Sequence, residues 1–220
     1  MKDKINVDGY IIKNLSPIKK SFINKNKKFS ARGIYNNKKV KIYEVFDENQ
    51  GFLRQFVSKN KKLSLYFPKL ITFNKKFIVE EWLEGELLSK MKPSFFYKMK
   101  YSFVIKKIIH QMWITKYNKE VFDYIGYIYK RLGKKCEFDL GKIPLRINHN
   151  DLSLDNILKT NEGIKIIDNE FLGNNRGWIL NFKNSFLKSG LIKNKYISKK
   201  ELAELWKIRN EWGSISLKSQ

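Results

Sequence analysis

Four polar side chains in the second half of the chain have the types and spacing of a phosphoryl-transfer site. His149, Asp151 and Asn156 form an H-x-D-x-x-x-x-N run, and Asp168 follows at the end of the apolar segment 164–167. A loop aspartate can accept the proton of an attacking hydroxyl, while an asparagine and an aspartate on the two sides of a hairpin can hold Mg²⁺ against phosphate oxygens. The pattern therefore predicts Asp151 as the catalytic base, with Asn156 and Asp168 as metal ligands.

His149 is expected to brace this loop rather than to react. A lone histidine in such a place is usually a hydrogen-bonded core residue, but only 2 His occur among the 220 residues, and chance seldom produces the whole run. The other common nucleotide- and metal-binding patterns, GxxxxGK[ST], GxGxxG and HExxH, are absent from the sequence. The run and Asp168 are therefore the strongest chemical signal in the sequence.

The elements that must position these residues begin with a β-rich segment, residues 1–85. Segments 39–45 and 76–79 have strand propensity, and Asn36-Asn37 predicts a turn before the first of them. Between these strands Asp47 can cap a helix, whose apolar stripe is formed by Phe52, Leu53, Phe56 and Val57. These patterns predict a small antiparallel sheet that carries one helix.

After Gly85 the pattern becomes mostly helical. Residues 93–131 have the spacing of long amphipathic helices with a break near 117–118, and strand-like segments follow at 145–147, 156–158 and 164–167. A turn at 161–163 joins the last two as a hairpin, and Ser198 with Glu201 forms a capping box for a final helix. We predict an α+β fold with a nucleotide-binding lobe at 1–85 and a larger catalytic and substrate lobe at 86–220.

The charge balance indicates an anionic partner but not a reader of nucleic-acid sequence. The chain has 45 basic and 21 acidic residues, a formal net charge of +24, and its basic residues are 39 Lys and only 6 Arg. Sequence-specific nucleic-acid binding relies on Arg for bidentate contacts, so a lysine excess favours a solvated coat over base recognition. An anionic substrate and an anionic membrane surface stay open as partners.

Length and cysteine content limit the class of protein. A chain of 220 residues with 42% hydrophobic residues can bury a core without disulfides. The single cysteine, Cys136, excludes an internal disulfide and a CxxC zinc pair. No apolar run is long enough for a membrane span, and the first residues lack the apolar core of a signal peptide. We expect a cytoplasmic protein.

The motifs as a whole resemble those of a known family. INHNDLSLDNIL, followed by IKIIDNEFLGNN, resembles the catalytic and metal-binding loops of the choline kinase and aminoglycoside phosphotransferase group, the small-molecule branch of the protein-kinase-like fold. The resemblance runs from about residue 30 to 183 and is specific over 147–173. It implies a bilobal fold, with a small antiparallel-sheet N-lobe and a mostly helical C-lobe, that uses ATP and Mg²⁺.

The resemblance also implies the residues that hold the nucleotide. Lys41 would contact the α and β phosphates and pair with a helix glutamate, for which Glu48 is the candidate, and backbone groups near Glu81 and Leu83 would face adenine. Two alternatives stay open at this point. Lys39 shares the strand face of Lys41, and Glu48 could do no more than favour the start of the helix.

The sequence departs from the family pattern in three places. Arg176 and Leu180 stand where carboxylates are expected, so the second carboxylate, which braces the catalytic loop, is either replaced by Asn181 or missing. The segment 30–37, where a phosphate-covering loop is expected, contains one glycine. The segment where the family builds an aromatic box for a quaternary ammonium contains Trp178, Trp206 and Trp212. Trp206 sits on a helical apolar stripe, which favours core packing over a place in such a box.

Together these features predict an Mg²⁺-dependent small-molecule kinase. It would move the γ-phosphate of ATP to a hydroxyl of a choline- or ethanolamine-like amino alcohol or of a sugar. One alternative is a catalytically weak or inactive nucleotide-binding module, which the residues at 176 and 180 suggest. Another is a basic protein that binds a membrane surface or nucleic acid, which the net charge of +24 suggests. The acceptor, the choice between ATP and GTP and the oligomeric state are open.

Overall fold

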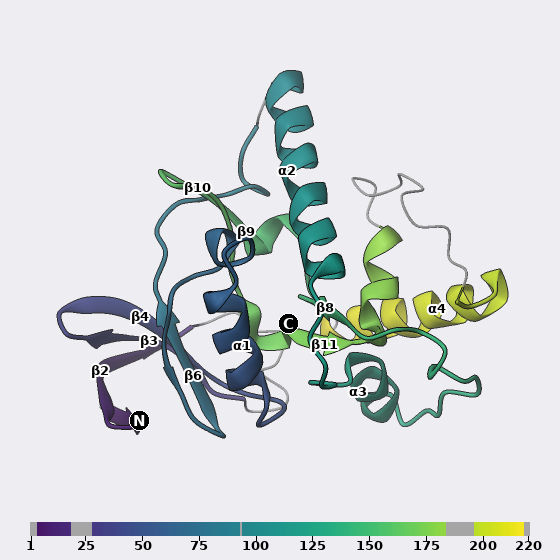
Figure 1. Cartoon of the computed structure of the whole chain (residues 1–220), viewed down its shortest axis with the longest axis horizontal. Coiled ribbons are helices and arrows are strands. Elements are labelled where there is room, and N and C mark those ends of the chain that lie inside the picture. Colours follow the sequence, from purple (N-terminus) through teal and green to yellow (C-terminus); the bar gives the residue numbers. More distant parts are fainter. Residues whose placement is uncertain (1–3, 19–27, 93, 184–195, 218–220) are drawn as a thin grey trace.

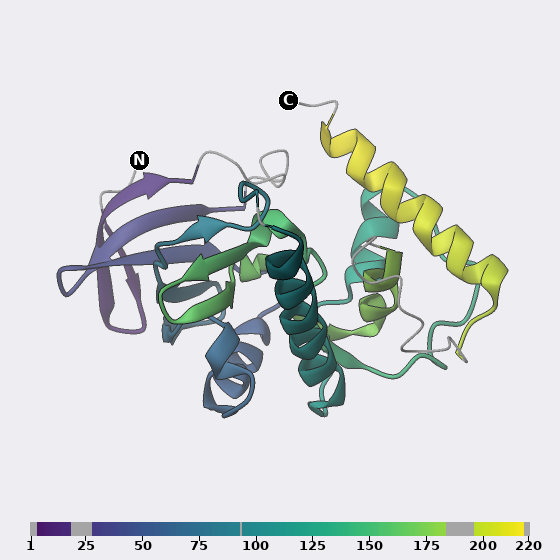
Figure 2. The same cartoon turned by 90° about the horizontal axis from the view of Figure 1, so that it is seen from above.

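The computed structural model describes residues 4–18, 28–92, 94–183 and 196–217. An antiparallel sheet lies at one end of the molecule and α3 (Tyr124–Arg131) and α4 (Lys199–Leu217) at the other, with α2 (Phe95–Ile114) standing between them (Figures 1 and 2). Among the described residues, no helix is long and apolar enough to cross a bilayer.

The sheet at the N-terminal end has six strands in the order β1-β2-β3-β4-β6-β5, all antiparallel. The predicted turn at Asn36-Asn37 is confirmed: both residues have left-handed φ values, 46° and 59°, which suits a two-residue hairpin turn. The strands are β1 (Lys4–Val7), β2 (Tyr10–Pro17), β3 (Ser30–Tyr35), β4 (Lys38–Glu44), β5 (Leu70–Phe73) and β6 (Phe77–Glu81).

The expectation of a phosphate-covering loop at 30–37 was therefore wrong. This segment forms strand β3 and the turn after it. The connection that enters this strand joins β2 to β3, and residues 19–27 within it lie outside the described part. The Ser30 end of β3, rather than the Asn36 end, contacts the second half of the chain, since the Ser30 hydroxyl donates to Glu170.

The only α-helix among the described residues of the first half, α1 (Gln50–Lys59), joins the two halves of the molecule. Its Leu53 and Val57 are fully buried in the same core cluster as Ile147 and Ile166. The predicted stripe was partly wrong, because Phe52 is 55% exposed, with its ring against that of Phe73. The helix start is fixed by Gln50, whose side-chain oxygen accepts from the backbone N–H groups of residues 46 and 47.

The described part of the second half contains three α-helices, α2, α3 and α4, and several short elements. The predicted hairpin at 161–163 is confirmed, and so is the capping box, since Ser198 N–H donates to Glu201 and Glu201 N–H donates to the Ser198 hydroxyl. The strands are β7 (Glu86–Leu87), β8 (Arg146–Asn148), β9 (Ile157–Thr160), β10 (Gly163–Ile166) and β11 (Gly173–Asn175). The 3-10 helices of this half are η3 (Leu154–Asn156), η4 (Asn169–Phe171) and η5 (Arg176–Lys183), whereas η2 (Ser64–Tyr66) follows α1 in the first half.

Candidate active site

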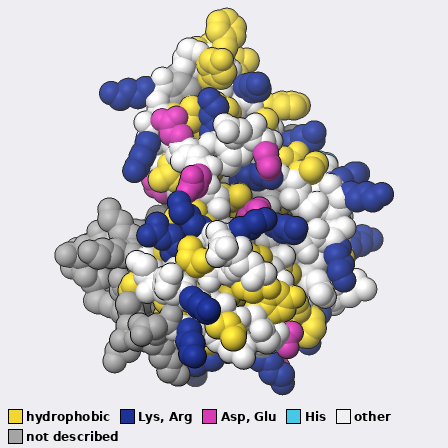
Figure 3. Space-filling view, turned by 90° about the vertical axis from the view of Figure 1, so that its left-hand side faces the viewer, with side chains coloured by type: hydrophobic (Ala, Val, Ile, Leu, Met, Phe, Trp, Pro, Cys, Tyr) yellow, Lys and Arg dark blue, Asp and Glu magenta, His cyan; other side chains and the backbone are white. Residues whose placement is uncertain are grey.

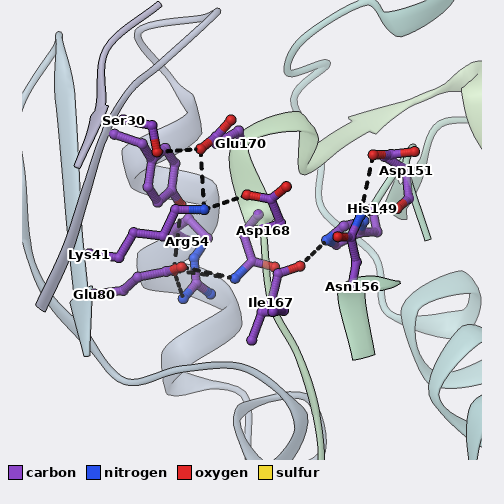
Figure 4. A network of polar contacts seen from close by, with 12 residues as sticks. Ser30, Lys41, Arg54, Glu80, His149, Asp151, Asn156, Ile167, Asp168 and Glu170 are labelled. Atoms are coloured by element: carbon purple, nitrogen blue, oxygen red, sulfur yellow. Dashed lines mark hydrogen bonds and ion pairs between the residues drawn. The ribbon is translucent and has the colours of Figure 1, made fainter. Parts of the chain in front are cut away.

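Lys41 of β4 lies at the centre of a charged network between the sheet and the second half (Figure 4). It is 8% exposed, and its Nζ lies 2.5 Å from Asp168 Oδ1 and 3.2 Å from Glu170 Oε1. Burial alone would lower the pKa of Lys41, but the two carboxylates outweigh it and raise the pKa above its usual value. The ammonium is therefore held charged in a buried place. Lys39, by contrast, is half-exposed and pairs with Glu84 at the surface.

Asp168 reaches this network because the chain turns sharply after β10. Its φ of 61° and ψ of 49° place it in the left-handed region, which is strained for a non-glycine residue and is common at functional sites. Burial pushes the pKa of Asp168 up, yet attraction to Lys41 and the hydrogen bond from it hold the pKa below its usual value. Asp168 is therefore a stable anion that lies between Lys41 and the segment of His149 and Asp151 (Figure 4).

Glu170 is a member of the network that the sequence reasoning quoted in its motif but gave no role. It is 4% exposed, accepts from the Ser30 hydroxyl at 2.7 Å and lies beside Lys41. Burial raises the pKa of Glu170, and Lys41 opposes that shift only in part. The signal that could have found it is the I-D-x-E spacing, which puts this carboxylate two residues after Asp168.

The pairing of Lys41 with Glu48 is not made. Glu48 lies in the turn before α1, its side chain is 60% exposed, and its contact is Lys75 at 3.6 Å. The reason is that α1 begins only at Gln50 and contains no carboxylate, so the helix presents other polar groups to the interior. Asp168 and Glu170 take the place that was predicted for Glu48.

The buried charges of α1 and β6 form a second pair beside Lys41, which the sequence reasoning missed. Arg54 Nη2 lies 3.0 Å from Glu80 Oε2, each side chain is 1% exposed, and Asn169 also donates to Glu80. Glu80 is the register partner of Lys41 on the neighbouring strand. This pair ties α1 to β6, the neighbour of the strand that carries Lys41, and removing one partner would leave an uncompensated buried charge.

His149 links the catalytic loop to the segment that leads to Asp168. Its side chain is fully buried, and its Nε2 lies 2.9 Å from the carbonyl oxygen of Ile167, so this nitrogen carries the proton and donates it. Burial lowers the pKa of His149 to about 4, which keeps the ring neutral at physiological pH. These contacts support the bracing role predicted for His149.

Asp151 is held by Asn156 and remains accessible. Asn156 Nδ2 donates to the backbone oxygen of Asp151 at 2.7 Å and to its Oδ2 at 3.2 Å, while Arg209 of α4 lies 3.9 Å from its Oδ1. The side chain is 39% exposed. Its partly desolvated surroundings raise the pKa of Asp151 to about 6, against an opposing effect of Arg209, so the group can both accept and return a proton near neutral pH.

Asn156 and Asp168 offer oxygen atoms that suit Mg²⁺. The amide nitrogen of Asn156 is occupied by Asp151, and no described residue donates to its Oδ1; Asp168 is an anion. The backbone N–H of Ile167 donates to the backbone carbonyl oxygen of Asn156 at 2.9 Å, which holds the segment before Asp168 beside Asn156. The described residues contain no cluster of three or more His, Cys, Asp or Glu that could hold a metal alone. A magnesium ion here would take further oxygens from phosphates and water, as it commonly does.

Asparagine amides, not carboxylates, brace the catalytic loop. Asn148 donates to Asn150, and Asn150, whose φ is 64°, donates to the carbonyl oxygen of Phe171 at 2.6 Å. Arg176 instead pairs with Glu120 at 2.6 Å, and Leu180 is buried in the core. The Asn181 side chain, predicted as a substitute brace, lies outside the described residues. The loop is thus fixed without the two expected carboxylates.

The three tryptophans do not form a shared box. Trp178 is 4% exposed, donates to the Pro144 carbonyl and packs against Trp113 and Tyr196 in the core. Trp212 packs on Tyr127, and Trp206 lies beside the Arg209 guanidinium at 6.0 Å. Core packing is therefore the observed role of Trp178.

The backbone near Glu81 leaves a donor for a ligand. Glu81 N–H donates to Lys69 and Trp82 N–H donates to Lys39, whereas no described residue accepts from Leu83 N–H. Leu83 lies just beyond β6, which ends at Glu81, so its N–H is outside the hydrogen bonding of the sheet.

Comparisons with known proteins give one kind of match. No family model matches the chain, and no curated protein sequence matches it. Among solved structures, choline kinase LicA from Streptococcus pneumoniae has a TM-score of 0.51 at 14% identity, over 94% of this chain and 92% of that one. The gentamicin complex of APH(2")-IIa has a TM-score of 0.51 at 12% identity, over 93% of this chain and 79% of that one.

At identities this low, the structural similarity shows the fold alone. The chain has the mixed α+β, protein-kinase-like fold of aminoglycoside phosphotransferases and of choline kinase LicA, with an antiparallel-sheet part and a mostly helical part. The resemblance inferred from the loops at 147–173 is confirmed at this level. A LicA complex with AMP, with a TM-score of 0.51 at 14% identity over 90% of this chain and 73% of that one, has the same fold with a nucleotide bound.

Proposed function

We propose that this protein is an Mg²⁺-dependent phosphotransferase that moves the γ-phosphate of ATP to a hydroxyl group of a small molecule. The observation that carries the proposal is one arrangement in a kinase-like fold: a buried ammonium, Lys41, beside the ionised Asp168, and an accessible Asp151 held by Asn156. A phosphoryl-transfer site needs these parts in proximity, because positioning and electrostatic stabilisation do most of the catalysis.

Each residue has a role that its surroundings support. Asp151, with a pKa of about 6, accepts the proton of the acceptor hydroxyl. Asn156 and Asp168 would hold Mg²⁺, which would neutralise charge on the phosphates. Lys41 binds the α and β phosphates, which replace part of its contact with the carboxylates of Asp168 and Glu170. His149 positions the loop and remains neutral.

The nucleotide would lie between the lobe of residues 1–85 and the lobe of residues 86–220. The Leu83 N–H and a backbone carbonyl near Glu81 would bind adenine at the end of β6. Support for ATP comes from the neighbours: one is a complex with AMP, and another, APH(2")-IIa at a TM-score of 0.50 and 14% identity, is a complex with streptomycin and ATP.

A sugar is favoured over a choline-like amino alcohol as the acceptor. The Arg209 guanidinium lies 3.9 Å from Asp151, where it would repel a cationic acceptor. Trp178 is used in the core and cannot contribute to an aromatic box. A neutral or acidic hydroxyl compound fits these surroundings better than a quaternary ammonium.

The experiment is a screen for ATP consumption with Mg²⁺ over choline, ethanolamine, aminoglycosides and neutral and acidic sugars. Turnover that requires one acceptor supports the proposal and names the acceptor class. ATP binding, seen as thermal stabilisation, without turnover on any acceptor would favour a nucleotide-binding module instead. Absence of both ATP binding and turnover would reject the hypothesis that the chain binds a nucleotide.

A further inference from the structure

Helix α2 is apolar on two opposite faces. Its inner face packs through Tyr101, Ile105, Ile108 and Met112, all at most 7% exposed. Four further large apolar side chains near its start lie on the side away from these and are exposed: Phe95 (69%), Phe96 (80%), Met99 (56%) and Phe103 (72%). We call these four residues the outer face of α2. With 3.6 residues per turn, positions 96, 99 and 103 form one stripe.

This outer face is the largest group of exposed aromatic side chains in the described part of the chain. It lies at the free end of α2, which projects beyond the rest of the molecule (Figure 1). Apolar side chains gather at the same end in the space-filling view, with lysine or arginine side chains on both sides (Figure 3). A contiguous apolar group rimmed by charge is typical of an interaction surface.

The chain segment that carries the outer face has charges of one sign. The sequence from residue 87 to residue 119 contains eight lysines and no aspartate or glutamate. Lys100 and Lys107 are exposed and border the stripe on one side of the helix, and Lys92 is exposed just before it. A helix with an apolar stripe of aromatic residues between lysines has the composition of a helix that lies in a bilayer interface.

We propose that the outer face of α2 docks on an anionic lipid bilayer, with its aromatic side chains in the headgroup region and its lysines against lipid phosphates. A second copy of the chain is a poorer partner, because two such faces would bring lysines against lysines without a carboxylate between them. Nucleic acid would satisfy the lysines, but single strands are usually bound in grooves, whereas these exposed rings belong to a helix end that projects from the molecule (Figure 1).

Docking through α2 would also fix the catalytic loop relative to the lipid. The inner face of α2 shares a cluster with Ile157, and Leu152 and Leu154 pack against that cluster. Leu152 directly follows Asp151 in the sequence. The docking proposal itself does not require the proposed phosphotransfer, because it rests on the exposed residues alone.

Flotation with vesicles tests this proposal directly. The full chain is mixed with phosphatidylcholine vesicles that contain about one third phosphatidylglycerol, or with pure phosphatidylcholine, at about 0.1 M and at about 0.5 M salt. We expect binding to the anionic vesicles at the lower salt concentration, with an at least tenfold loss of affinity for Phe96→Ser/Phe103→Ser and for Lys100→Glu/Lys107→Glu.

Two control variants separate local docking from overall charge. Lys13→Glu/Lys38→Glu makes the same change in net charge at exposed positions of the N-terminal sheet, and Leu65→Ser removes a 62% exposed apolar side chain elsewhere. Both should change the affinity by less than about threefold. Circular dichroism and thermal unfolding establish that every variant folds.

Three results would overturn the proposal. The first is no binding to anionic vesicles at low salt. The second is equal loss of binding in the α2 variants and their controls, which would indicate diffuse attraction to the whole basic surface. The third is that the chain does not bind vesicles but forms another complex through α2. That complex would be either a dimer, seen by analytical ultracentrifugation, or a nucleic-acid complex, and the α2 variants would abolish it.

Discussion

Replacement of Lys41 by methionine should separate its role from that of its neighbour Lys39. In the free protein, Lys41→Met leaves Asp168 and Glu170 close together without their cation. Removing one partner of a buried pair costs about 3 to 5 kcal/mol; because the Asp168 side chain is 37% exposed, we expect a smaller loss of unfolding free energy, about 2 to 3 kcal/mol. Lys39→Met removes a surface pair and should cost less than about 0.5 kcal/mol.

The pH dependence of that loss tests its electrostatic origin. Without Lys41, the folded-state pKa of Glu170 and Asp168 rises above the unfolded value, so the folded variant takes up protons that the unfolded chain does not. The stability gap between wild type and Lys41→Met should therefore shrink as the pH falls from 7.5 to about 5. Urea unfolding at both pH values measures it.

ATP binding gives the second readout for the same variants. Charge-assisted hydrogen bonds contribute about 1.5 to 3 kcal/mol, so Lys41→Met should weaken MgATP binding by about tenfold to a hundredfold, and Lys39→Met by less than about twofold. The loss of ATP-induced thermal stabilisation measures the change. Equal effects of the two substitutions, or a stability gap that does not depend on pH, would refute the reasoning.

Four further substitutions test the other members of the site. Asp151→Asn should lower turnover by about 10² to 10⁴ while MgATP affinity stays within about twofold, and Asp168→Asn should abolish the Mg²⁺-dependent part of ATP stabilisation. Arg209→Gln should raise the Asp151 pKa above about 6, so the acidic limb of the pH–rate profile moves to higher pH. The pKa of buried His149 is about 4, below the unfolded value near 6.5, so the free energy of unfolding decreases as the pH is lowered below 6.5. In the wild type this titration contributes about 2 kcal/mol to the decrease between pH 7.5 and 5, measured by urea unfolding, and His149→Gln should remove that contribution.

Local patterns predicted much of the fold. The Asn36-Asn37 hairpin turn and the Ser198–Glu201 capping box depend on residues within a few positions of one another, and both are present in the structure. The run from His149 to Asn156 is likewise local, and backbone hydrogen bonding holds it beside the next strand. Short-range chemistry is readable from sequence because the same few atoms must meet in any fold that contains the motif.

The long-range pairs could not be predicted in this way. Glu48 seemed to lie on the buried stripe of a helix, but α1 starts two residues later, so Glu48 lies in the preceding turn and helical spacing does not apply to it. The Arg54–Glu80 pair and the approach of Arg209 to Asp151 join segments far apart in the chain. No spacing rule indicates such contacts, since tertiary packing alone decides them.

Transfer of phosphate to an acceptor is the most direct test of the account. The acceptor that supports ATP consumption is incubated with MgATP and wild-type protein or Asp151→Asn, and the product is identified by mass spectrometry and by ³¹P NMR. The account predicts a phosphate ester on an acceptor hydroxyl with the wild type and at least about a hundredfold slower formation with Asp151→Asn. A product phosphorylated at an equal rate by Asp151→Asn, or ATP hydrolysis that leaves the acceptor unchanged, would contradict it.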